Sequence, residues 1–65
     1  MTDLAAKTFA KLRQIHQVLG DVMPCGWADY RATVTGFYGV DADMLDALQR
    51  LGHFHTTDNS VRFAA

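Results

Sequence analysis

Apolar side chains recur at helical spacing over the first third of the chain. Within residues 3–19 they fall on one side of a 3.6-residue helical wheel, and polar side chains fall on the other. The apolar set comprises Leu4, Ala5, Phe9, Leu12, Ile15 and Leu19. Thr2 or Asp3 is suited to cap the start, and Gly20 suits the position just after a helix end. The pattern predicts a helix over about 3–19, with His16 partly buried near its apolar side.

The pattern of apolar and polar positions over residues 42–51 predicts a second amphipathic helix. Asp41 is suited to cap it, and Asp43 lies in the first turn, where the helix dipole favours a negative charge. The apolar stripe comprises Met44, Leu45, Leu48 and Leu51. On the opposite face, Asp46 and Arg50 have the i, i+4 spacing of an ion pair.

Residues 53–64 predict a β-hairpin whose turn is Asp58-Asn59, two residues that tolerate left-handed backbone geometry. In this register one face carries Phe54, Thr56, Val61 and Phe63. The other face carries His53, His55, Thr57, Ser60 and Arg62. A slip of one residue would mix the apolar and polar sets, so the alternation itself favours this pairing.

Residues 28–37 are compatible with two structures. Pro24 and Gly26 break the chain just before them. As a helix, this region presents a stripe of Trp27, Tyr30, Val34 and Phe37. As a strand, residues 30–35 are rich in the aromatic and β-branched side chains that strands favour. In either structure, the aromatic side chains here form the heart of the core, or the core together with an exposed binding face.

The composition predicts one small domain over residues 1–65. The chain has 65 residues, with six basic and seven acidic side chains, which is too short for a second domain. No apolar stretch approaches the roughly 18–20 residues that span a bilayer, and charges are spread through the first twenty residues. We therefore expect a cytoplasmic protein that does not enter a membrane. Its fold must rest on the apolar core alone or on self-association.

Neither catalysis nor a metal site is indicated by the residue spacing. Cys25 is the only cysteine, and His53 and His55 share a strand face without an evident third ligand. Glycine-rich phosphate loops and the spacing of a nucleophilic triad are absent from the sequence. We therefore expect a non-enzymatic binding module that uses no metal and no cofactor.

The element order helix, helix, helix, hairpin resembles the winged-helix version of the helix-turn-helix fold. Val34 and Tyr38 match the inward positions of the second helix, and Leu45 and Leu48 match those of the third helix. Between these helices, Gly39 matches the glycine of the tight turn and Val40 the apolar residue after it. The segment Leu51-Gly52-His53-Phe54 matches the exit from the third helix into the wing. Thr35 stands where the family usually has a small residue, most often alanine. The resemblance implies an α+β fold in which 28–37 is helical.

Members of the winged-helix superfamily bind DNA, and similar modules bind proteins or dimerise. The helix that would enter the major groove exposes Asp43 and Asp46, which repel phosphates, and only Gln49 and Arg50 offer suitable donors to base edges. The acidic helix favours a protein-interaction domain, with a dimerising or inhibitory accessory role, whose partner is a protein or a second copy. The candidate contact residues are Trp27, Tyr30, Tyr38, Asp43 and Asp46.

The alternative function is a DNA-binding transcriptional regulator. The net charge of −1 lacks the cationic excess usual for nucleic-acid binding. Phosphate contacts would then come from the first helix and the wing, with base contacts from the third helix. The candidate residues are Lys7, Lys11, Arg13, Gln49, Arg50, His53, His55 and Arg62.

Overall fold

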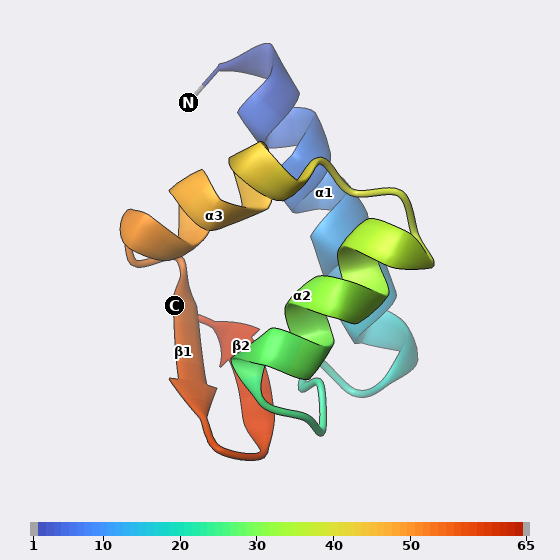
Figure 1. Cartoon of the computed structure of the whole chain (residues 1–65). Helices are drawn as coiled ribbons and strands as arrows, with labels where there is room; N and C mark the ends of the chain where they lie inside the picture. The colour runs from blue at the N-terminus through green and yellow to red at the C-terminus, as the bar shows by residue number, and fades with distance from the viewer. Residues whose placement is uncertain (1, 65) are drawn as a thin grey trace.

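Three helices followed by a two-stranded antiparallel sheet make up the fold (Figure 1), as seen in a computed structural model that describes residues 2–64. The elements are α1 (Asp3–Val18), α2 (Trp27–Gly36), α3 (Ala42–Arg50), β1 (Phe54–Thr57) and β2 (Ser60–Phe63). The expected α+β arrangement is confirmed, and the region around 28–37 is a helix rather than a strand. Met1 and Ala65, the ends of the domain expected over 1–65, lie outside the described residues.

Helix α1 is capped at both ends by its own sequence. The Thr2 hydroxyl accepts a hydrogen bond from the Ala5 backbone N–H at 3.1 Å. At the other end, the N–H groups of Gly20 and Asp21 donate to the carbonyls of Gln17 and His16, the pairing of a Schellman motif. Both Gly20 and Asp21 have a positive φ, of 76° and 70°. This turn directs the connector after α1 back toward the core.

The connector joins the sheet through Met23. Its backbone N–H donates to the Val61 carbonyl at 2.8 Å, and the Val61 N–H donates back to the Met23 carbonyl at 2.9 Å. The Met23 side chain is buried, whereas Val22 is exposed. The connector therefore adds a single bridge along the free edge of β2.

Helix α3 also begins and ends with local hydrogen bonds. The Asp41 carboxylate accepts from the Met44 N–H at 2.9 Å. The N–H groups of Gly52 and His53 donate to the carbonyls of Gln49 and Leu48 in a second Schellman motif. Because the helix ends at Arg50, Leu51 is its C-cap residue and is 74% exposed. Its expected place in the buried stripe is therefore wrong.

The core draws apolar side chains from every element. Its buried members are Leu12, Ile15, Met23, Tyr30, Val34, Val40, Leu45, Leu48, Phe54 and Val61. The expected inward positions of Phe37 and Tyr38 are wrong, since these side chains are 81% and 40% exposed. Phe37 is the C-cap residue of α2 and keeps helical backbone angles, with its N–H bonded to the Thr33 carbonyl at 2.8 Å, so its exposure reflects its place at the end of the helix, and Tyr38 lies one residue beyond it. Leu4, on the first turn of α1, and Leu19, its C-cap residue, are half exposed.

The hairpin has the register that the alternation predicts, with Phe54 opposite Phe63 and Thr56 opposite Val61. Thr56 lies on the apolar face of the ladder yet is exposed. Among residues 2–64, Asp21 is the only non-glycine residue with a positive φ, so the Asp58-Asn59 turn does not use left-handed geometry. The Thr57 and Ser60 hydroxyls lie 2.7 Å apart beside this turn.

Replacing Gly26 by alanine is expected to destabilise the fold by about 1–3 kcal/mol. An added Cβ would lie 2.9 Å from the Asp58 backbone carbonyl oxygen, which cannot rotate away as a flexible side chain would. The matched control is Gly36→Ala at the end of α2, where a Cβ meets nothing within 4 Å. That change should stabilise the helix by about 0.5–1 kcal/mol. Urea unfolding followed by circular dichroism measures both, and equal effects would contradict the contact at Gly26.

Candidate functional site

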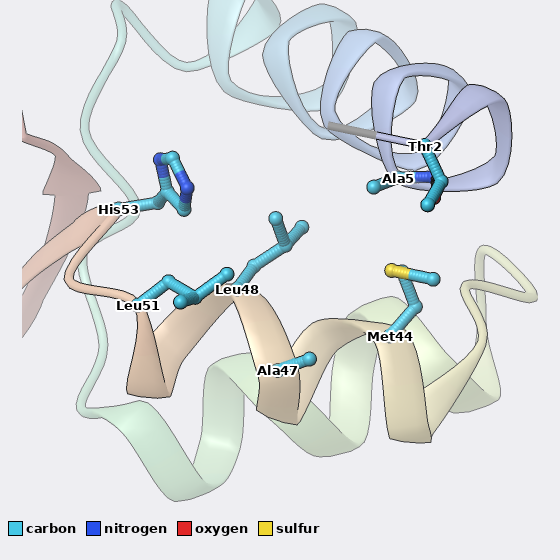
Figure 2. Close-up of a pocket in the computed structure, with 7 residues that line it drawn as sticks. All are labelled: Thr2, Ala5, Met44, Ala47, Leu48, Leu51 and His53. Carbon is cyan, nitrogen blue, oxygen red and sulfur yellow. Dashed lines mark hydrogen bonds between the residues drawn. The ribbon is translucent and has the colours of Figure 1, made fainter.

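An open apolar groove of about 450 Å³ lies between the start of α1 and the length of α3 (Figure 2). Its lining residues are Thr2, Ala5, Met44, Ala47, Leu48, Leu51 and His53. Figure 2 shows Met44 and Leu48 pointing from α3 toward α1, where the small side chains of Thr2 and Ala5 face them. The groove remains open because α1 presents small side chains at this position.

The sequence of α3 creates one wall of the groove. Met44, Ala47 and Leu51 recur at spacings of three and four, which aligns them along one side of a helix. Leu48 beside them is buried, Met44 and Ala47 are half-buried, and Leu51 stands on the rim. The groove therefore has a buried floor and an exposed apolar edge.

His53 closes one end of the groove. The Schellman motif at Gly52 turns the chain so that the His53 ring meets the edge of the Phe9 ring, with centroids 5.5 Å apart. The Thr2 hydroxyl is already engaged in capping α1. With few polar groups left to use, the groove is suited to apolar side chains rather than to a charged or phosphorylated ligand.

A bidentate ion pair ties α2 to α3 on the side of α3 that faces away from the groove. The Arg31 guanidinium donates through Nε and Nη2 to the two carboxylate oxygens of Asp46, at 2.8 and 3.0 Å. This hydrogen bonding lowers the pKa of Asp46 and raises that of Arg31. The expected pair of Asp46 with Arg50 is therefore wrong, because Arg31 from the neighbouring helix takes both oxygens. In the described part of the chain Asp43 and Arg50 are exposed and form no ion pair.

The residues expected to contact a protein do not form one surface. Tyr30 is fully buried, so its expected role in an exposed surface is wrong. Trp27 is half-buried against the Tyr30 and Phe54 rings, at centroid distances of 5.3 and 5.2 Å. Tyr38 lies in an exposed edge-to-face pair with Phe37, at 5.0 Å. Of the five candidates, Asp43 and Asp46 lie on the helix that forms the groove wall.

The residues expected to contact nucleic acid are divided among several surfaces. Arg13 and Arg62 do meet, since both line a hollow of about 430 Å³ with Gln17, Asp21, Val22 and Phe63. The Arg13 guanidinium lies 5.8 Å from the centroids of the Phe9 and Phe63 rings. Lys7 and Lys11 are exposed on another side of α1, because residues two or six positions apart lie about 120–160° apart around a helix.

The remaining four candidates are also dispersed. Gln49 and Arg50 are exposed at the end of α3, and His55 is exposed on β1. His53 is partly buried in the groove and lies outside the strand that contains His55. Within residues 2–64 no three histidine, cysteine, aspartate or glutamate side chains gather as metal ligands would.

A buried polar pair joins α1 to α2. A hydrogen bond of 2.7 Å connects His16 Nε2 and Tyr30 Oη, with the donor set by the imidazole tautomer. The His16 ring is fully buried and stacks on Phe63 at 4.2 Å, while its Nδ1 has no hydrogen-bond partner. Burial lowers the pKa of His16, and the backbone and carboxylate of Asp21 partly oppose this shift. Burial also raises the pKa of Tyr30. The sequence predicts a partly buried His16, whereas the ring is fully buried, and it does not predict Tyr30 as the partner.

The sequence pattern does not predict the groove, because it places Met44 and Leu51 in the buried stripe of α3. Two features of the sequence together indicate the groove: the apolar stripe on α3 is wide, and the residues at the start of α1 are small. No protein-family model matches the chain, and no curated protein or solved structure shows significant similarity to it. Across residues 2–64, every helix is too short or too polar to cross a bilayer.

Proposed function

We propose that this chain is a non-enzymatic, winged-helix-like module that holds a protein partner in the groove between α1 and α3. The observation that carries the proposal is the groove itself, whose lining is largely apolar and whose rim residue Leu51 is 74% exposed. An apolar recess bordered by polar residues is typical of a protein-interaction site. The winged-helix description is supported by the element order and by Gly39, whose φ of 71° accompanies the turn between α2 and α3.

The charges around α3 support a protein partner over DNA. Asp41 and Asp43 are exposed at the start of the helix, which is the part that would approach the phosphates in a helix-turn-helix complex. Arg31 and Asp46 neutralise each other. One observation favours the DNA-binding alternative: Arg13 and Arg62 line the same hollow.

A photo-crosslinker in place of Leu51 tests the protein-binding proposal. Because this side chain is exposed, Leu51→p-benzoylphenylalanine should fold and should form a covalent protein adduct on irradiation in the cells that produce the protein. Adding Ala47→Arg, which fills the groove with a charged side chain, should reduce the adduct at least about tenfold, because a buried unpaired charge costs several kcal/mol. The same crosslinker at Gln14, on the outer side of α1, is the control.

The proposal fails if position 51 gives no adduct, or if its adduct equals the one from position 14. Titrating labelled protein with a mixed-sequence DNA duplex provides the opposing arm. Amide shifts at Arg13 and Arg62 that fade as salt is added would favour the DNA-binding alternative. The protein-binding proposal predicts no such shifts.

A further inference from the structure

We infer that the occupant of the groove is a second copy of this chain, docked with its α3 antiparallel to the α3 of the first copy. This inference rests on the proposed function and names the partner. A two-fold axis would pass near Ala47, at the middle of the exposed side of the helix. Each copy would then present the same surface to the other, as an isologous dimer requires.

The order of apolar side chains along α3 fits this arrangement. Met44 and Leu51 lie one turn to either side of Ala47 on the groove side of the helix. In an antiparallel pair centred near Ala47, Met44 of each copy comes within one residue's rise, about 1.5 Å along the axis, of Leu51 of the other. The small Ala47 side chain at the centre allows the two helices to approach closely, since interaxial distance depends on the side chains at the contact.

In this dimer, Leu51 of each copy would fill the groove of the other copy. It is 74% exposed on the groove rim, next to the turn at Gly52. Leu4, on the first turn of α1, is also 55% exposed. Docking a second copy would bury both Leu51 side chains at once, and the removal of this surface from water would stabilise the dimer.

The charges on α3 are complementary to themselves under the same two-fold operation. Asp43 and Arg50 lie seven residues, or almost two turns, apart, so they share one side of α3, about 75–95° around the helix from the groove-lining Met44, Ala47 and Leu51. Antiparallel pairing brings Asp43 of each copy to Arg50 of the other and forms two ion pairs. A parallel pairing would place Asp43 level with the Asp43 of the other copy and Arg50 level with Arg50, so neither ion pair would form.

The neighbouring charges leave these two residues available. Asp46 is held by Nε and Nη2 of the Arg31 guanidinium, and the Asp41 carboxylate caps the start of α3. Within residues 2–64 neither Asp43 nor Arg50 takes part in an ion pair. The antiparallel arrangement also places each positive helix end near the negative end of the other helix, which is favourable.

Charge reversal tests the arrangement in the intact chain. Sedimentation over protein concentrations up to about 1 mM measures the dimer dissociation constant. Asp43→Arg or Arg50→Asp alone would place like charges at both contacts, and each should weaken the dimer about 3- to 30-fold. The double variant Asp43→Arg/Arg50→Asp restores opposite charges at both contacts and should return to within about threefold of the wild type. Lys11→Asp, on the outer side of α1, is the control and should leave association unchanged.

Each outcome supports or overturns the inference. A wild type that stays monomeric overturns it, and so does a dimer that ignores the single reversals or is not rescued by the double variant. A monomer that still forms a heterologous adduct at position 51 overturns self-association while the proposed function stands. The absence of both a dimer and an adduct overturns the two together. Amide spectra of each variant establish that it is folded.

Discussion

Leu45→Ala is expected to lower the free energy of unfolding by about 2–5 kcal/mol. The Leu45 side chain is fully buried in the core, so its removal leaves a cavity that the surrounding helices cannot fill without moving. A single core in a chain of this length rarely supplies more than about 3–5 kcal/mol of stability. The loss is therefore comparable with the whole stability of the fold. Urea unfolding followed by circular dichroism provides the measurement.

The matched control is Leu51→Ala, the same chemical change close by on the same segment. Because Leu51 is 74% exposed, its truncation should change the free energy of unfolding by less than about 0.5 kcal/mol at low protein concentration. At high concentration the same variant should weaken any dimer formed through α3. If Leu45→Ala were no more destabilising than Leu51→Ala, the burial of Leu45 would be contradicted.

Tyr30→Phe is the second change expected to have a large effect, a loss of about 1–3 kcal/mol. It removes the hydroxyl that pairs with His16 Nε2 and leaves a buried imidazole with no partner on either nitrogen. The double variant His16→Phe/Tyr30→Phe replaces both partners with apolar rings of similar shape. It should recover most of the lost stability, because neither buried polar group then remains. Equal losses in the single and double variants would contradict this explanation.

The same pair sets the expected response to acid. Burial holds the pKa of His16 below its usual 6.5 in the folded protein, so below that pH the unfolded chain binds a proton that the folded chain does not. The free energy of unfolding should therefore be fully maintained above pH 6.5 and should fall as the pH drops below it. The double variant lacks this titration and should lose less stability between about pH 7 and pH 5. His55→Gln, at an exposed position, should retain the wild-type slope.

The sequence predicts best those features that depend on neighbouring residues. The hairpin register follows from the alternation around Asp58-Asn59, and Thr2 and Asp41 cap their helices as their positions indicate. The choice between helix and strand near Tyr30 needed the resemblance to a known fold, because periodicity and propensity disagreed. Local pattern therefore accounts for the elements and for most of the inward positions.

The features that the sequence did not predict depend on where elements end or meet. Phe37 and Leu51 extend the apolar stripes of α2 and α3, but each is the C-cap residue just beyond its helix and is exposed there. Asp46 has a suitable partner on its own helix, yet the guanidinium of Arg31 reaches it from α2. The groove similarly depends on how α1 crosses α3 beside Ala5, which no local pattern specifies.

The bridge between Met23 and Val61 determines how independent the hairpin can be. A hairpin attached only through its first strand could swing relative to α3. Here the segment after α1 is hydrogen-bonded to β2, and Gly26 lies against the backbone at Asp58, so the hairpin is held along one strand and at its tip. The first and last parts of the chain are thereby tied together, and the hairpin cannot swing away from the connector without breaking the two hydrogen bonds between Met23 and Val61.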